Sequence, residues 1–156
     1  MGCFRGFIGT NFTGRGESKM TSPVTPDELL ARYITSSRWF RQQDQTVKQD
    51  AFIPPENPLE LSVTRHSTTL IEDDIWIIGR SVASGVSRNL HGIADIKTNC
   101  VINQRLNVVP QPVPDNPNHA NIVGWPLEKN ERKMKALELA KAARFVPNPE
   151  AVAQTP

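Results

Sequence analysis

Residues 59–82 carry the strongest structural signal in the chain, because two different hydrophobic periods follow one another within them. Residues 61–66 alternate with a period of two, which is typical of a strand with one buried face. Thr69 and Glu72 then form a T-x-x-E capping box, the signature of a helix N-terminus. After it, apolar residues recur every three or four positions along one helical stripe: Ile71, Ile75, Ile78 and Val82. We therefore predict a β–α unit on which the remaining strands build.

Shorter signals of the same kind continue along the rest of the chain. A second capping box, Thr25 with Glu28, precedes apolar residues at helical spacing and predicts a helix over residues 26–37. In the predicted strand over residues 90–97, the even-numbered side chains are small or apolar, so we expect them to face the isoleucine-rich helix. The remaining predicted elements are a short helix over residues 98–106, strands over 107–109 and 119–126, and a helix over 128–144.

These elements predict the fold class α+β, a single small domain with a three- to four-stranded sheet and two to three main helices packed on it. We place this domain at residues 20–146. Residues 1–19 show no period and residues 147–156 are rich in proline and alanine, so we expect both flanks to be disordered tails. The first flank could instead be a mis-assigned start, with Met20 as the true initiator.

Charge and cysteine content restrict the setting of the protein more than its function. The 156 residues carry a net charge of +2, which by itself indicates neither a nucleic acid nor an anionic membrane as partner. The two cysteines, Cys3 and Cys100, form no C-x-x-C pair, which favours a reducing compartment. There is no apolar run of membrane-spanning length and no signal-peptide pattern, so we predict a cytoplasmic protein with no membrane partner.

The three histidines are the candidate catalytic residues. His66, His91 and His119 each lie in or beside a predicted strand, so neighbouring strands could bring them to one edge of the sheet. Arg65 and Asp95 would then lie close by, and such a set could transfer protons and hold the phosphate of a phosphodiester. Imidazole also suits zinc, but the chain has no H-x-H or H-E-x-x-H spacing, and we predict no metal and no cofactor. Alternatively, each histidine is an ordinary polar residue of the fold.

Aromatic and apolar residues outside the expected core indicate a binding surface. Arg38, Trp39 and Arg41 could stack on a base, or Trp39 could pack on the core while the arginines reach water. Trp125 ends a predicted strand, and Leu139 points away from the other apolar residues of the C-terminal helix. We expect these residues to be exposed and to contact a partner.

Three functions follow from these residues, in order of preference. The first is a small accessory protein without catalysis that binds another protein. The alternative is a small enzyme that acts on nucleic acid or a nucleotide through the histidine cluster. The second alternative is a non-catalytic nucleic-acid binder that uses Arg38, Arg41 and the basic C-terminal helix.

Overall fold

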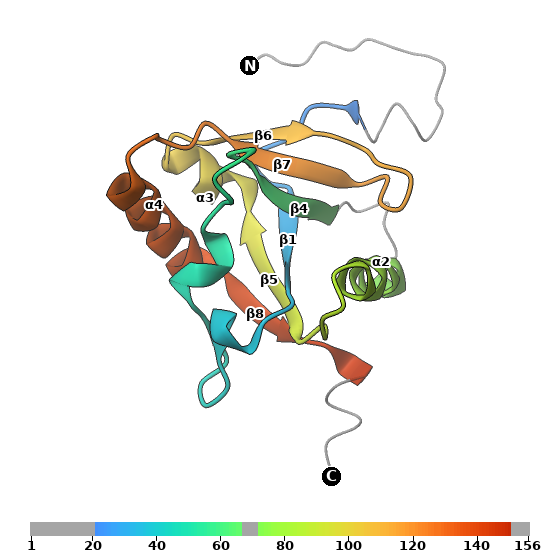
Figure 1. Cartoon of the computed structure of the whole chain (residues 1–156). Helices are drawn as coiled ribbons and strands as arrows, with labels where there is room; N and C mark the ends of the chain where they lie inside the picture. The colour runs from blue at the N-terminus through green and yellow to red at the C-terminus, as the bar shows by residue number, and fades with distance from the viewer. Residues whose placement is uncertain (1–20, 67–71, 151–156) are drawn as a thin grey trace.

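The computed structural model describes residues 21–66 and 72–150, and these residues are organised around one antiparallel sheet (Figure 1). Within them the sheet has six strands in the order β6-β7-β4-β1-β5-β8. These strands are β1 (Leu29–Ile34), β4 (Leu61–His66), β5 (Gly92–Lys97), β6 (Asn107–Pro110), β7 (His119–Val123) and β8 (Arg144–Pro147). A separate short hairpin pairs β2 (Phe40–Arg41) with β3 (Thr46–Val47).

Helices cover both faces of the large sheet, and Figure 1 shows α2 and α4 on its opposite sides. The helices are α2 (Glu72–Gly85), α3 (Thr98–Asn103), α4 (Lys129–Ala142), and the 3-10 helices η2 (Ser37–Trp39) and η3 (Gln49–Phe52). On one face, Ile75 of α2 packs with Tyr33 and Ile93. On the other face, Phe52 and Leu139 belong to the larger core, which also includes residues of α3. No helix of the described part of the chain has both the length and the apolar character that crossing a membrane requires.

The predicted fold class, α+β, is confirmed, but the sheet is larger than the three to four strands expected. The four strands that the sequence predicts correspond to β4, β5, β6 and β7. The two additional strands are β1, which lies within the predicted helix over residues 26–37, and β8, which follows directly on the C-terminal helix. Their addition extends the sheet to six strands.

Residues 26–37 thus contain a strand where a helix is predicted. The capping-box partners do meet, since the amide of Thr25 donates to Glu28 Oε1 at 3.4 Å and the amide of Glu28 donates to Thr25 O at 3.1 Å, but they close a turn. β1 then runs through the middle of the sheet, with Leu30 buried in one core and Tyr33 in the other. A strand buried on both faces reads as a nearly continuous apolar run, so its period of two is hidden.

The isoleucine-rich helix packs on the opposite face of β5 from the one predicted. It contacts the side of Ile93, whereas Ala94 and Ile96 belong to the other core. Gly92 leaves room for β8, because a Cβ atom there would lie 2.4 Å from Val146 O and 2.7 Å from the ring of Phe145. The small residues of this strand therefore do mark close neighbours, but the neighbour at Gly92 is a strand.

Both long helices begin close to their predicted starts. α2 begins at Glu72, while Thr69, its predicted capping partner, lies outside the described residues. α4 begins after Glu128, whose carboxylate accepts a hydrogen bond from the amide of Glu131 at 2.9 Å. α4 ends at Ala142, slightly before the predicted end at residue 144, and the chain turns into β8.

β6 and β8 form the two edges of the sheet. On β6, the amide of Val108 donates to the side-chain oxygen of Asn107 at 2.9 Å, and Pro110 has no N–H. On β8, the last residue is Pro147. Proline and side-chain caps are features by which natural sheets reduce the exposed hydrogen-bonding capacity of an edge strand.

Candidate functional site

A wedge-shaped opening separates β1 from β4 in the middle of the sheet. The two strands pair from Leu29 with His66 to Ala31 with Thr64, whereas β1 pairs with β5 along its whole length. Beyond Ala31 the two strands diverge, and the backbone groups that a ladder would have used need other partners.

The guanidinium of Arg32 bridges this opening. Its Nε donates to Ala51 O at 2.8 Å and its Nη1 donates to Ser62 O at 3.1 Å, so it ties β1 to both η3 and β4. It lies 5.0 Å from the centroid of the Trp39 ring, within the range of a cation–π contact. Burial lowers the pKa of Arg32 to about 10, so the group stays charged at neutral pH. No carboxylate of residues 21–66 or 72–150 forms an ion pair with it.

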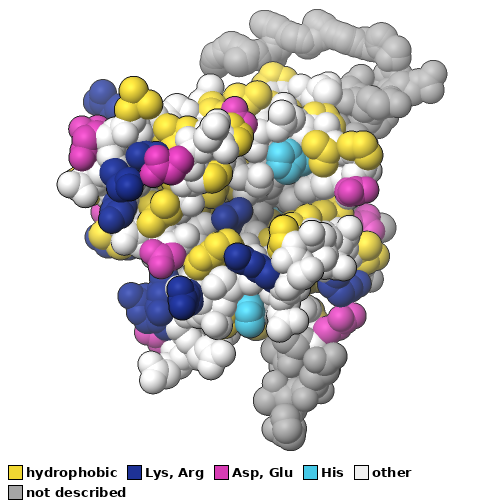
Figure 2. Space-filling view, in the orientation of Figure 1, with side chains coloured by type: hydrophobic (Ala, Val, Ile, Leu, Met, Phe, Trp, Pro, Cys, Tyr) yellow, Lys and Arg dark blue, Asp and Glu magenta, His cyan; other side chains and the backbone are white. Residues whose placement is uncertain are grey.

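A pocket of about 520 Å³ lies beside Arg32, between the C-terminal half of α2 and strands β4 and β7, and we call it the wedge pocket. The described residues that line it are Arg32, Tyr33, Thr35, Trp39, Ser62, Val63, Thr64, Val82, Val86, Arg88, Asn116 and His119. None of them is acidic. Figure 2 shows this face, where Lys or Arg, His and hydrophobic side chains border a hollow. Cationic and apolar groups around one cavity favour an anionic ligand with an apolar part.

Hydrogen bonds fix the polar wall of the wedge pocket. Asn116 Nδ2 donates to Thr64 Oγ1 at 2.8 Å, and the amide of Asn118 donates to Asn116 Oδ1 at 3.1 Å. Tyr33 Oη donates to Ile75 O at 2.5 Å, and burial raises the pKa of this phenol, which therefore stays protonated. These side chains are held in place before any ligand arrives, which lowers the entropic cost of binding.

Among the residues predicted as catalytic, His119 lines the wedge pocket. Its Nδ1 lies 2.9 Å from Gln111 O, which can only accept a hydrogen bond, so Nδ1 carries a proton. Nε2 is then the ring nitrogen left for a ligand or for water.

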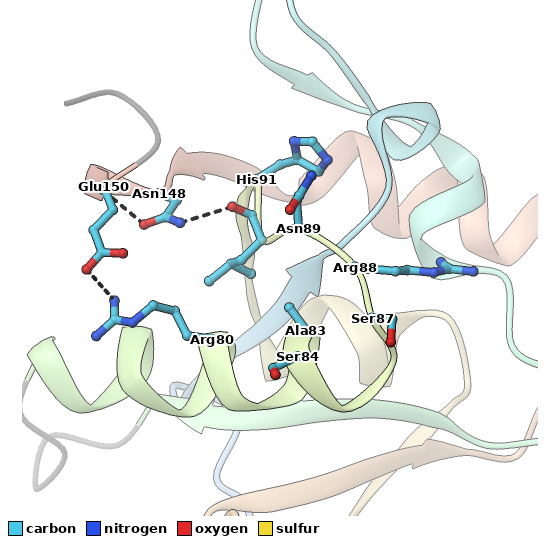
Figure 3. Close-up of a pocket in the computed structure, with 10 residues that line it drawn as sticks. Arg80, Ala83, Ser84, Ser87, Arg88, Asn89, His91, Asn148 and Glu150 are labelled. Atoms are coloured by element: carbon cyan, nitrogen blue, oxygen red, sulfur yellow. Dashed lines mark hydrogen bonds and ion pairs between the residues drawn. The ribbon is translucent and has the colours of Figure 1, made fainter. Parts of the chain in front are cut away.

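A second pocket of about 700 Å³ lies at the C-terminal end of α2, and we call it the C-terminal pocket (Figure 3). The described residues that line it are Arg80, Ala83, Ser84, Ser87, Arg88, Asn89, Leu90, His91, Asn148 and Glu150. Asn148 Nδ2 donates to Leu90 O at 3.0 Å, and Glu150 pairs with Arg80 at 3.4 Å. Arg88 lines both pockets.

The structure distributes the three histidines over three places. His119 lines the wedge pocket, His91 lines the C-terminal pocket, and neither set of lining residues includes His66. His66 lies beside Asp95 instead, with 3.5 Å between Nδ1 and Oδ1. The ring of His91 lies 5.4 Å from that of Phe40, centroid to centroid, and burial lowers the pKa of His91. The expected meeting of all three histidines at one sheet edge is therefore not what the fold produces.

Arg65 stabilises the fold and lines neither pocket. Its Nε and Nη2 donate to the two carboxylate oxygens of Glu28 at 2.6 and 3.0 Å, and its Nη1 donates to Ser22 O at 2.8 Å. Because neighbouring strand residues point to opposite faces, Arg65 lies on the other side of β4 from His66. The predicted role of Arg65 in holding a phosphate next to the histidines does not fit this position.

Trp125 and Leu139, two of the predicted binding residues, are core residues, which corrects the expectation that they are exposed. Trp125 is buried and donates its Nε1 hydrogen to Ile122 O at 2.9 Å. Leu139 is completely buried, because its face of α4 is the one that packs on the sheet. The large apolar residues that α4 exposes are Met134 and Leu137, on its other side.

The remaining predicted binding residues, Trp39, Arg38 and Arg41, differ in their surroundings. Trp39 is half-buried and lines the wedge pocket, as described above. Arg38 and Arg41 are exposed, and Arg41 Nη1 donates to Thr46 Oγ1 at 3.2 Å. Neither arginine lines the wedge pocket, so the expected stacking platform of arginines around Trp39 is not assembled there.

Sequence reasoning missed Arg32 as a site residue, because it lies inside the segment predicted to be a helix. The signal that could have found it is a charged residue in the middle of the apolar run LLARYI, since a charge within a buried strand needs a specific reason.

Among the described residues, no group of three or more His, Cys, Asp or Glu side chains is arranged to hold a metal ion. Comparison of the chain with protein-family models, curated proteins and solved structures finds no match. The geometry of the two pockets that contain His91 and His119 is therefore the basis for a functional proposal.

Proposed function

We propose that the protein binds a small anionic ligand of nucleotide size in the wedge pocket, without catalysis. The observation that carries this proposal is the charge balance of the pocket: Arg32 has no carboxylate partner among the described residues, and no described lining residue is acidic. Even partial burial of a guanidinium without a counter-ion is costly, and a bound anion would reduce that cost.

The size and lining of the pocket support a nucleotide over a bare anion. A volume of about 520 Å³ is within the usual range for small-molecule sites. Tyr33 and Trp39 supply aromatic surface, Val82 and Val86 supply apolar surface, and Arg88 is exposed and free of carboxylate partners among the described residues. A phosphate against arginine and a base against the apolar wall would use both kinds of surface.

Isothermal titration calorimetry with adenosine monophosphate, adenosine and inorganic phosphate tests the proposal. We expect the nucleotide to bind more tightly than either of its parts, and at 100 times its Kd to raise the free energy of unfolding by about 2.7 kcal/mol. Arg88→Ala removes an exposed cation and should weaken binding about tenfold or more. Arg144→Ala is the matched control, because Arg144 is an exposed arginine that lines neither of these pockets but a different one of about 850 Å³, between the β2–β3 hairpin and the C-terminal end of α4.

Two results would contradict the proposal. One is the absence of a heat signal and of a thermal shift with every compound. The other is equal weakening by Arg88→Ala and Arg144→Ala, because that would show attraction to net charge and not to the pocket. Arg32→Lys adds a second check, since Lys keeps the charge but cannot reproduce the forked donation to Ala51 and Ser62.

A protein partner is the second candidate, favoured by the exposed apolar side chains beside and on α4. Leu127 is 88% exposed, Met134 is 68% exposed and Leu137 is 40% exposed. Met134 and Leu137 also line one shallow pocket on α4, and exposed apolar side chains of this kind are typical of surfaces that contact another protein. In this proposal the protein is a cytoplasmic accessory factor. Met134→Glu should abolish partner capture at an unchanged melting temperature. Val109→Glu, which changes an exposed apolar residue on β6, is the control and should leave partner capture intact. Equal capture by all three proteins would refute it.

A further inference from the structure

The wedge pocket and the C-terminal pocket both reach the C-terminal end of α2, and we call the two pockets together the groove. Arg88 belongs to the lining of both, so the two cavities adjoin at this residue. Figure 3 shows the Arg88 side chain extending from the turn after α2, away from Arg80 and Glu150 at the other end of the C-terminal pocket. A ligand that contacts the Arg88 guanidinium can therefore reach into both cavities.

The turn after α2 fixes the backbone at Arg88. Ser87 has a φ of 56°, in the left-handed region that commonly ends helices. This conformation lets the amide of Arg88 donate to Ala83 O at 2.9 Å, and the amide of Ser87 donates to Ser84 O at 3.0 Å. The position from which the arginine side chain extends is thus set by the helix end.

Charge along the groove is arranged for a short polyanion. Arg88 lies at its centre, because it lines both pockets, and Arg32 lies in the wedge pocket. No described residue that lines the wedge pocket is acidic. Glu150 lies in the far part of the C-terminal pocket, held by Arg80 at 3.4 Å. The charges of Glu150 and Arg80 cancel at that end, so it adds little attraction for a further phosphate and the track that favours phosphate is short.

Both cavities offer groups suited to a nucleoside. The wedge pocket has the rings of Tyr33 and Trp39, and the C-terminal pocket has the ring of His91 and the exposed amide of Asn89. Volumes of about 520 and 700 Å³ are each sufficient for a small-ligand moiety. Basic residues between surfaces that accept bases are the usual arrangement in proteins that bind single-stranded nucleic acid.

We propose that the groove binds a single-stranded oligonucleotide, with a phosphodiester against Arg88 and one nucleoside in each pocket. This inference rests on the proposed function, because it extends the ligand of the wedge pocket from a single nucleotide to an oligonucleotide. Two linked nucleotides are the shortest ligand that fills both pockets, and the bases must be unpaired because each enters a separate cavity.

Calorimetric titration with adenylate mono-, di- and trinucleotides, in both ribose and deoxyribose forms, tests the inference. Filling the second pocket should tighten binding about tenfold from mono- to dinucleotide, with little further gain from the third unit because the Arg80–Glu150 pair has no net charge to attract another phosphate. Asn89→Ala should weaken binding of the dinucleotide several-fold and leave the mononucleotide unchanged. Arg88→Ala should weaken both, and it should reduce the slope of log Kd against log salt by about 0.7.

Arg144→Ala serves again as the exposed control, and melting temperatures confirm that each variant is folded. Equal affinity for mono- and dinucleotide, with Asn89→Ala silent, would overturn the inference and leave the mononucleotide proposal standing. Failure of every nucleotide to bind would overturn both. Equal losses in Arg88→Ala and Arg144→Ala would overturn the inference too, since the binding would then belong to the general basic surface.

Discussion

The bidentate ion pair between Glu28 and Arg65 should be among the most costly polar interactions to break in this protein. The two side chains are 12% and 6% exposed, and Arg65 keeps its bond to Ser22 O when the carboxylate is removed. Breaking one partner of a buried pair typically costs about 3–5 kcal/mol. Because that backbone bond remains and an amide can still accept from the guanidinium, we expect the lower end, about 3 kcal/mol, for Glu28→Gln.

Urea unfolding followed by circular dichroism measures this cost. With a slope m of about 2 kcal/mol/M, a loss of about 3 kcal/mol lowers the unfolding midpoint by about 1.5 M. The double variant Glu28→Gln/Arg65→Met should lose much less than the sum of the two single variants, since it leaves no buried charge unpaired. A loss below about 0.5 kcal/mol in Glu28→Gln, or strict additivity in the double variant, would refute the reasoning. Nucleotide affinity should not change, because neither residue lines a pocket.

Three further perturbations test the core and the titration of the fold. Gly92→Ala should lower the free energy of unfolding by about 1–3 kcal/mol, because the new Cβ would lie 2.4 Å from Val146 O. Gly85→Ala is the control and should not be destabilising, because a Cβ there would have nothing within 4 Å. Equal urea midpoints for the two variants would contradict this prediction. Leu139→Ala should cost about 2–5 kcal/mol by thermal unfolding, and a loss near zero would place this residue on the surface after all. His91 has a pKa lowered by burial, so its contribution to stability is complete above an unfolded-state pKa of about 6.5 and is lost as the pH falls through the lower folded-state pKa. Urea midpoints at several pH values should therefore fall less steeply on acidification in His91→Gln than in the wild type, and identical slopes would show that burial of His91 has no such effect.

Much of the secondary structure could be predicted from local sequence patterns. The alternation in residues 61–66 predicts β4 with the bounds observed, and the strong helix formers after Glu128 predict α4 to within two residues at its C-terminal end. In β4 the apolar side chains of Leu61 and Val63 alternate with polar ones, although Thr64 on the polar side is buried as well. α4 is recognised by its helix formers and not by a hydrophobic period, because its apolar residues lie on more than one side.

Strands β1 and β8 of the large sheet could not be predicted because their environment comes from distant residues. β1 has neighbours on both edges and cores on both faces, which removes the alternation and leaves only an apolar run behind a capping box. β8 forms a strand because Phe145 packs against Gly92 and its ring stacks on that of Phe40, with 4.6 Å between the ring centroids. No local sequence pattern contains these contacts.

The candidate site shows the same limit. The wedge pocket exists because β1 and β4 stop pairing after Ala31 with Thr64, and Arg32 occupies the gap that results. The presence of three histidines in or beside strands predicts a shared site only if the strand order brings them together. In this fold, His91 and His119 line different pockets. Of the predicted residues, Trp39 and His119 line the wedge pocket, where they lie with Arg32 and Arg88.

The lack of free backbone amides on the β6 edge restricts how another molecule can bind to the protein. An extended peptide or a second copy of the chain would normally join a sheet by bonding to free amides along an edge. On β6 the amide of Val108 is already bonded to Asn107, and Pro110 offers none, while β8 ends in Pro147. Strand addition is therefore discouraged along β6, so a partner that approaches this edge must be selected by side-chain chemistry. The same caps would protect the protein from polymerising edge to edge at high concentration, a protection that replacing Asn107 and Pro110 with valine should remove.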